Sequence, residues 1–173
     1  MPDIRKIYQG RAVNLTVETV TLPNGQTTEL DIIRHPGAAA VVPLTADGGV
    51  ILIRQYRHAA GGFIYEIPAG KLDGGEAPET CAHRELVEEA GVRAGRLDHL
   101  ASILTTPGFT DEVIHLYLAR DLEPAQQALE ADEVLTVEEH SLDRAVAMCA
   151  DGTLRDAKSM CALLLAQRFL RGA

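Results

Sequence analysis

Apolar and polar residues alternate along the first part of the chain, which is the pattern of a half-buried strand. Residues 13–22 alternate with one phase slip, Pro23–Gly25 has the composition of a tight turn, and residues 29–33 resume the pattern. The pattern predicts a β-hairpin over about residues 7–33. Two interpretations of this hairpin stay open: it is an edge of the main sheet, or it is a separate surface that pairs with a second subunit.

Compact apolar runs follow at residues 37–43 and 50–56, and these two predict strands buried in the centre of a sheet, while further strands are predicted after them. The predicted strands cover residues 37–43, 50–56, 63–68, 97–104, 113–118 and 134–137. The stretch 121–132 is acidic, polar and interrupted by a proline, so it is interpreted as a mobile loop.

Capping residues and periodicity predict three helices. The first covers about residues 78–90, because Pro78 and Glu79 suit a first turn and Gly91 suits a helix stop. The second begins after Ser141 as its N-cap and ends near residue 150. The third covers about residues 156–170 and is expected to be amphipathic through Met160, Leu163, Leu164 and Phe169. The order of elements predicts an α/β (α+β) fold, namely an α/β/α sandwich with a mixed sheet.

Composition narrows the class of protein. The 173 residues are enough for one domain with a substantial core, and 46% hydrophobic with 24% charged residues is ordinary for a globular protein. The formal net charge is −9, which argues against a nucleic-acid partner because such binding needs a basic surface. An anionic substrate would then need bound metal and a few local arginines to reverse the field.

The cysteine count and the apolar runs bear on location. Three cysteines without CxxC or Cys/His spacing predict reduced thiols, with no disulfide framework and no zinc site. The first ten residues lack an apolar run, so no signal peptide is expected. Apolar runs such as 162–166 are too short to span a membrane. We therefore expect a cytoplasmic protein without membrane partners.

The candidate chemistry lies on the first predicted helix. Glu85, Glu88 and Glu89 fall at i, i+3 and i+4, so the three carboxylates share one face. Like charges at this spacing repel by roughly 0.2–0.5 kcal/mol, and burial would make the repulsion worse. Hard oxygen ligands suit Mg²⁺ or Mn²⁺, so the cluster predicts a site for more than one divalent ion. For a bare ExxEE, a solvated acidic helix face is the better interpretation.

The wider spacing reverses that preference. The stretch from Gly70 to Val92 resembles the signature of the Nudix hydrolase family, G-x5-E-x7-R-E-U-x-E-E-x-G-U, where U is aliphatic. The matching positions are Gly70, Glu76, Arg84, Glu85, Leu86, Glu88, Glu89, Gly91 and Val92.

Other residues suggest how a substrate would be held. Arg54 and Arg57 end a buried strand, and a guanidinium there is either a plain surface charge or a phosphate clamp. The segment 105–112 is either an ordinary turn or a rigid binding loop, with Phe109 available for stacking and Glu112 as an acceptor for ribose or base. Glu66 is given no catalytic role, since it can simply pair with a nearby arginine.

Within the Nudix family the chain is most similar to the ADP-ribose pyrophosphatases. The similarity rests on YEIPAGK at 65–71, PGFTDE at 107–112, the acidic loop before residue 134, and DAKSMCALLLAQ at 156–167. It implies a metal-dependent hydrolysis of ADP-ribose to AMP and ribose 5-phosphate. It also implies two or three Mg²⁺ or Mn²⁺ ions.

The resemblance also assigns roles to residues. The implied metal ligands are Glu85, Glu88, Glu89, the carbonyl of Ala69, and Glu133. The implied catalytic residues are Glu133 as the first choice of base, Glu130 as the second, Glu88 as an assistant, and Arg84 as the residue that orients the glutamates. The implied substrate contacts are Arg34, Arg54, Arg57, Lys71, Thr106, Phe109 and Glu112.

The resemblance further implies a homodimer with swapped N-terminal strands. We accordingly assign residues 1–36 to a hairpin that serves dimerisation and residues 37–173 to the catalytic domain. Two rival functions stay open: hydrolysis of another nucleoside diphosphate derivative, such as a sugar nucleotide or dinucleoside polyphosphate, and a non-catalytic ligand-sensing regulator.

Overall fold

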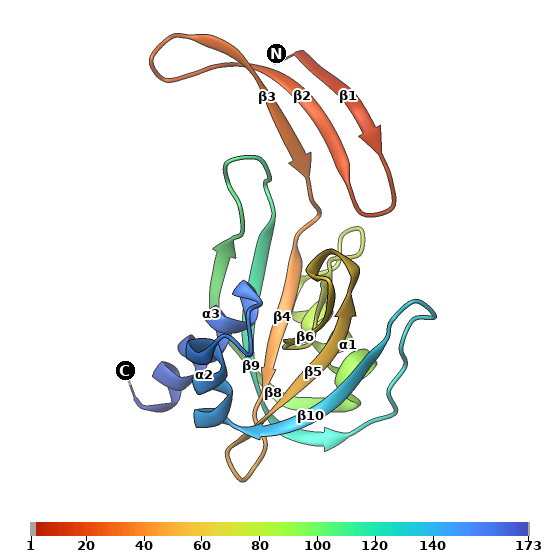
Figure 1. The fold of residues 1–173 in the computed structure, drawn as a ribbon, viewed down its shortest axis with the longest axis vertical. Helices are drawn as coiled ribbons and strands as arrows, with labels where there is room; N and C mark the ends of the chain where they lie inside the picture. The colour runs from red at the N-terminus through yellow and green to blue at the C-terminus, as the bar shows by residue number, and fades with distance from the viewer. Residues whose placement is uncertain (1–2, 173) are drawn as a thin grey trace.

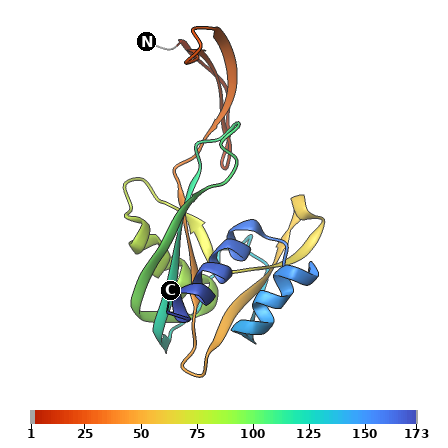
Figure 2. The same cartoon turned by 90° about the vertical axis from the view of Figure 1, so that its left-hand side faces the viewer.

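A small N-terminal sheet projects beyond a larger body in the computed structural model, which describes residues 3–172 (Figures 1 and 2). The sheet consists of β1 (Asp3–Gln9), β2 (Asn14–Thr21) and β3 (Thr27–Arg34), all antiparallel in this order. The predicted turn joins β2 to β3, but the unit is a three-stranded meander and not a hairpin. Apolar/polar alternation missed β1 because every residue of this strand is exposed, so no buried face imposes a pattern.

The body contains two further sheets. One has the order β7-β4-β9-β8 and the other β10-β5-β6. The strands are β4 (Ala38–Pro43), β5 (Gly49–Arg57), β6 (Gly62–Glu66), β7 (Ala69–Lys71), β8 (Val92–Leu104), β9 (Val113–Pro124) and β10 (Leu135–Ser141). The pair β4–β9 is parallel and the other pairs are antiparallel, so the predicted mixed sheet is confirmed.

Helices cover both faces of this body, as predicted. Helix α1 (Pro78–Ala90) packs through Ala82 and Leu86 on Ala39 and Val41 of β4. Helices α2 (Leu142–Asp151) and α3 (Ala157–Leu170) build a second core with the other side chains of β4 and with β9. A short 3-10 turn, η1 (His58–Ala60), lies between β5 and β6. Within residues 3–172, each helix is too short or too polar to reach across a lipid bilayer.

Two details differ from the sequence-based expectation. Asp121–Pro124 continues β9 in register with β8, so the predicted loop begins only after this strand. Helix α3 buries Ala162, Leu163 and Ala166, whereas Leu164 and Phe169 are 50% and 42% exposed. The helix is apolar over most of its surface, so its small alanines decide which face approaches β4 closely.

The N-terminal sheet is attached to the body by the loop between β8 and β9. The Ile33 N–H donates to the carbonyl of Phe109 at 2.7 Å, and Arg34 forms ion pairs with Glu18 and Asp111. Met1, Pro2 and Ala173, at the outer limits of the two predicted segments, lie outside the described residues. The division at residue 36 and the dimerisation role remain predictions.

Candidate active site

Helix α1 begins and ends where its sequence predicts. Pro78 occupies its first turn, where an unpaired N–H is not needed, and Glu79 lies near the positive end of the helix dipole. Gly91 has φ 66° and its N–H caps the carbonyls of Leu86 and Val87. With Leu86 anchored in the core, the helix presents its carboxylates toward β7.

Glu89 is the most deeply buried acid of α1, at 2% exposure. One carboxylate oxygen accepts the backbone N–H of Ala69 at 2.8 Å. Burial, together with the negative charges of Glu85 and Glu133, raises the pKa of Glu89 to about 8 even though the Ala69 N–H and Arg57 favour the ionised form. The carboxylate therefore has too little positive charge around it, which is the situation that a bound cation would relieve.

Glu85 lies one turn earlier, directly against β7. A Cβ atom at Gly70 would come within 1.7 Å of Glu85 Oε1, so glycine leaves room for the carboxylate in its present position. Burial raises the pKa of Glu85, and the charges of Glu88 and Glu133 act in the same direction against the opposing effect of Arg84. Gly70, the first fixed position of the signature, thus leaves space for the Glu85 carboxylate.

Arg84 holds three acids of this segment. Its Nη1 donates to Glu85 at 2.6 Å and to Glu88 at 2.9 Å, and its Nη2 donates to Glu76 at 3.0 Å. These contacts lower the pKa of Glu76, with the Arg84 hydrogen bond as the largest cause. Arg84 is therefore ion-paired with all three of these glutamates, and its role in orienting them remains a prediction.

The carboxylate set can be tested for its fit to divalent cations. Between residues 3 and 172, no three acid, histidine or cysteine side chains converge on one cation position, and Arg84 donates to oxygens of Glu85 and Glu88. The donors are nevertheless hard oxygens, and Glu85 and Glu89 both have raised pKa values. Such a set suits Mg²⁺ or Mn²⁺ in its chemistry.

The loop between β9 and β10 brings a further acid to this group. Gln127 Nε2 donates to the carbonyl of Glu89 at 2.6 Å, and the Ala128 N–H donates to the carbonyl of Glu88 at 3.1 Å. The loop is thereby tied to the end of α1, and the charge of Glu133 raises the pKa of both Glu85 and Glu89. Glu133 also accepts the N–H of Glu130 at 2.7 Å.

An open cavity of about 1120 Å³ lies over these residues. Of the predicted site residues, its lining includes Arg57, Ala69, Lys71, Arg84, Glu85, Glu88, Glu89, Thr106, Glu112, Glu130 and Glu133. The fold therefore gathers one side of α1, the end of β5, the β8–β9 loop and the acidic loop around one space large enough for a nucleotide.

Three predicted substrate contacts lie outside this lining. Arg34 is held by Glu18 at 2.6 Å and by Asp111 at 2.9 Å, at the junction with the N-terminal sheet. Arg54 stacks over the ring of Phe63 at 5.0 Å. Phe109 is 49% exposed. This chain alone does not bring these three side chains to the cavity. Their roles as substrate contacts remain predictions.

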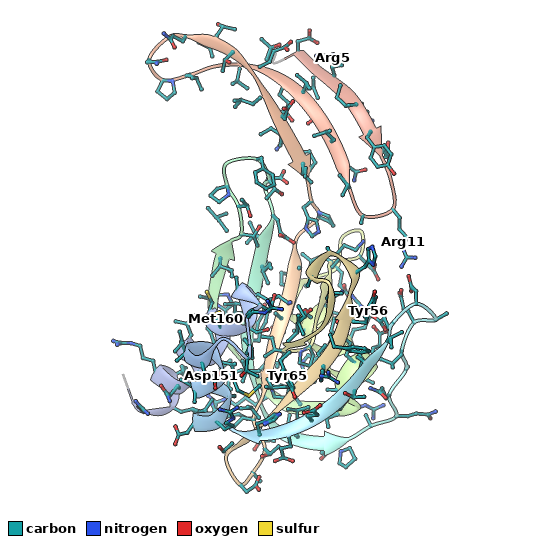
Figure 3. All side chains as sticks on the ribbon, in the orientation of Figure 1. Arg5, Arg11, Tyr56, Tyr65, Asp151 and Met160 are labelled. Carbon is teal, nitrogen blue, oxygen red and sulfur yellow. The ribbon has the colours of Figure 1, made fainter. Side chains whose placement is uncertain are left out.

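The structure also places residues in the lining that sequence reasoning did not select. They are chiefly Arg11, Gln55, Asp73, Asp132, Asp156 and Lys158. Arg11 extends from the turn between β1 and β2 toward the acidic loop, where it lies 2.8 Å from Asp132 (Figure 3). Lys158 and Asp156 lie in a segment, 156–167, that resembled the family without suggesting a role for either residue.

Comparisons with known proteins agree with this geometry. The model of the NUDIX domain family matches residues 34–163. The chain is 42% identical over 160 residues to a methanol dehydrogenase activator of Bacillus methanolicus. It is 40% identical over 160 residues to an ADP-ribose pyrophosphatase of Bacillus subtilis strain 168. Each alignment covers 91% of this chain and 86% of the relative.

One solved structure supports the fold. A crystal structure of an ADP compounds hydrolase superposes with a TM-score of 0.84 and covers 99% of this chain and 95% of that chain. Sequence identity is 24%, so this likeness supports the fold alone.

Proposed function

The chain belongs to the NUDIX family, and we propose that it is a metal-dependent hydrolase that cleaves the diphosphate of ADP-ribose to AMP and ribose 5-phosphate. The observation that carries this proposal is the pair Glu85 and Glu89, buried on α1 with raised pKa values at the floor of a nucleotide-sized cavity. The 40% identical relative named an ADP-ribose pyrophosphatase favours this substrate.

Glu85, Glu88, Glu89, Glu133 and the carbonyl of Ala69 would hold two or three Mg²⁺ or Mn²⁺ ions. Such ions, when bound, neutralise the diphosphate and lower the pKa of a water molecule.

Side chains of the chain itself would supply the catalytic base and the substrate contacts. Glu133 is the first choice as the base that removes a proton from the attacking water, because its charge acts on both buried glutamates. Glu130 is the second choice, since it lies on the same loop. Arg57 and Lys71 line the cavity as cations for the diphosphate, while Thr106 and Glu112 offer polar groups to the sugar or base.

A panel of substrates tests the proposed substrate. Purified protein with Mg²⁺ is incubated with ADP-ribose, a sugar nucleotide and a dinucleoside polyphosphate, and products are separated by chromatography. AMP and ribose 5-phosphate in equal amounts, with the highest kcat/KM for ADP-ribose, support the proposal. Preferential turnover of another compound would replace it with the alternative substrate. No turnover of any compound would favour the ligand-sensing regulator, although the complete set of signature glutamates argues against that function.

The N-terminal sheet supports a proposed homodimer. Ile4, Ile7 and Tyr8 of β1 are 50%, 47% and 60% exposed, so the sheet carries apolar side chains that its own body leaves uncovered. Exposed strands of this kind invite pairing with another chain. Residues 1–36 would then exchange between two copies, and light scattering should give about twice the 18.6 kDa chain mass.

A cytoplasmic location is proposed from the three cysteines. Cys81, Cys149 and Cys161 are all free thiols, as a reducing compartment would maintain them. Fractionation of the source cells would test this location.

A further inference from the structure

Glu66, at the end of β6, is a buried carboxylate that binds two cations. It is 2% exposed, and Arg57 donates to its two oxygens at 2.7 Å and 3.1 Å. The ammonium of Lys158 donates to the same carboxylate. Arg57 and Lys158 both line the cavity, whereas Glu66 does not. One buried acid therefore keeps two cations side by side at the cavity surface.

The first turn of α3 is built to fix Lys158. Asp156 is the N-cap of the helix, accepts the Ser159 N–H at 2.9 Å, and lies 3.0 Å from Lys158 Nζ. Ser159 Oγ in turn accepts the N–H of Ile67 at 2.9 Å, directly after β6. These bonds join the start of α3 to the strand that carries Glu66, so the position of Lys158 is determined by the fold.

Burial alone would raise the pKa of Glu66, but the hydrogen bonds and charges of Arg57 and Lys158 outweigh it and lower the pKa. Glu66 is therefore ionised at neutral pH, and it offsets the repulsion between the two cations. Without this anion, two positive groups held within a few ångströms of each other would separate.

We propose that Lys158, directly beside Arg57, is a further cation for the diphosphate of the substrate, and that Glu66 is the positioning residue that holds both. The proposal rests on the proposed function of the same cavity. Acidic side chains outnumber the cations in the cavity lining, although Arg11, Lys71 and Arg84 also line it, so a dianionic ligand needs more than one cation close to its phosphates. The guanidinium of Arg57 suits two phosphate oxygens at once, and the ammonium of Lys158 adds a compact charge beside it.

Calorimetry with ADP and with adenosine, both in Mg²⁺, separates a phosphate contact from a structural ion pair. In Lys158→Met, ADP binding should weaken about tenfold or more while adenosine binding stays at the wild-type value. Glu66→Gln should show the same selective loss, and Lys158→Arg should recover part of it. Arg168→Met, on the same helix but outside the cavity lining, should leave both ligands unaffected.

Equal affinities for ADP in wild type and in folded Lys158→Met would overturn the proposal. So would the failure of both neutral variants to fold, because the network would then be structural only. These measurements need no turnover. A wild-type protein that binds ADP but does not cleave ADP-ribose would reject the proposed function and leave the role of Lys158 measurable.

A different observation points to Gln55 of β5. This residue is 3% exposed, yet its Oε1 has no hydrogen-bond partner among residues 3–172. It precedes Arg57 by two positions, so both side chains lie on one face of the strand, and both line the cavity. A buried amide oxygen left without a donor costs about 1–3 kcal/mol, which a bound ligand can recover.

We infer that Gln55 accepts a hydrogen bond from an O–H group that arrives with the ligand. Two sources share this chemistry: water carried by a divalent cation, and a sugar hydroxyl of the nucleotide. The acids that line the cavity only accept hydrogen bonds when ionised, so they do not supply this donor.

Thermal unfolding of Gln55→Met tests the inference without activity. The ligand-free variant should be at least as stable as wild type, because the unpaired oxygen is gone. Its affinity for the ligand, measured from the ligand-induced rise in Tm, should fall by up to about fivefold. A loss already seen with Mg²⁺ alone identifies cation-bound water, and a loss seen only with Mg²⁺ and ADP identifies the sugar.

The matched control is His140→Phe. His140 Nε2 is the other buried side-chain nitrogen or oxygen without a hydrogen-bond partner in residues 3–172; it lies 3.4 Å from Glu138 Oε2 and outside the cavity lining. Its replacement should leave both ligand-induced rises unchanged. Wild-type rises in Gln55→Met with both ligand sets would overturn the inference. Failure of both Gln55→Met and Gln55→Leu to fold would also overturn it, since the amide would then serve the core.

Discussion

Each of two walls of one cavity buries a glutamate to the same extent, but the surroundings shift the pKa values of the two glutamates in opposite directions. Glu89 on α1 and Glu66 on β6 are each 2% exposed. Burial acts on both, but the pKa of Glu89 rises to about 8 while the pKa of Glu66 falls. Glu66 has two cations within hydrogen-bond reach, whereas Glu89 has one backbone N–H and two acidic neighbours. Burial alone therefore does not decide the pKa of a buried acid; the positive charge around it does.

Replacing each acid by its neutral amide is the strongest way to break this comparison. Glu89→Gln should lower Mg²⁺-dependent turnover by about a thousandfold or more, on the order of 4 kcal/mol of barrier. The same variant should be as stable as wild type or more so without metal, because the amide is neutral and, unlike Glu89, need not take up a proton on folding at neutral pH. Undiminished turnover in Glu89→Gln would reject its assignment as a metal ligand.

Glu66→Gln should change stability in the opposite direction. It leaves Arg57 and Lys158 without their shared anion, and we expect a loss of about 2–3 kcal/mol in the free energy of unfolding. The loss is at the low end for such pairs because the Arg57 side chain is 43% exposed and keeps part of its hydration. Urea titration of both variants in the presence of EDTA measures whether each substitution raises or lowers the free energy of unfolding. Equal stability changes would remove the distinction between the walls.

Gly70→Ala sharpens the comparison by disturbing only the acidic wall. The new Cβ would lie 1.7 Å from Glu85 Oε1, so the carboxylate must move, and turnover should fall about a hundredfold through the misplaced ligand. Overpacking at this position should cost about 1–3 kcal/mol of stability. Gly74→Ala is the control, since nothing lies within 4 Å of a Cβ there. A Gly70→Ala enzyme with wild-type kcat/KM would contradict the tight fit against Glu85.

The pH dependence of stability follows from the same contrast. Between the unfolded pKa near 4.5 and the folded pKa near 8, Glu89 binds a proton only in the folded state. The stability that this proton uptake contributes is present at low pH and is lost as pH rises from about 5 to 8. We expect a loss on the order of a few kcal/mol without metal. Urea titrations at several pH values should show this slope in wild type and a weaker slope in Glu89→Gln.

The sequence predicted the acidic wall far better than the wall around Glu66. Helical spacing alone put Glu85 and Glu89 on one face, and Pro78 and Gly91 marked both ends of α1. These are local relations along the chain, so periodicity and capping rules can find them. The signature then favoured a cation site over a solvated acidic face, a choice that spacing alone did not make.

The other wall depends on contacts between distant segments. Glu66 and Lys158 are separated by 92 positions, and no pattern along the chain says that the start of α3 meets the end of β6. Arg34 illustrates the converse. The resemblance implied a substrate contact for Arg34, and in this chain the arginine is held by Glu18 and Asp111 at the junction with the N-terminal sheet. Whether an arginine is free or paired is decided by tertiary packing.

The smallest expected effect concerns the link between the N-terminal sheet and the cavity. Arg11 lies 2.8 Å from Asp132 and 3.6 Å from Glu130, beside the candidate base Glu133, but all three side chains of these pairs are at least 60% exposed. Exposed pairs contribute about 0–1 kcal/mol and are screened by salt. Arg11→Gln should therefore lower kcat/KM at low ionic strength by no more than about fivefold. The difference should vanish in high salt, where the unfolding free energy also stays unchanged.

Arg5→Gln, which removes an exposed arginine of β1 paired with Glu29 at 3.7 Å, is the control. A salt-independent loss in Arg11→Gln alone would mean that this arginine contacts the substrate, so that the N-terminal sheet forms a third wall of the site.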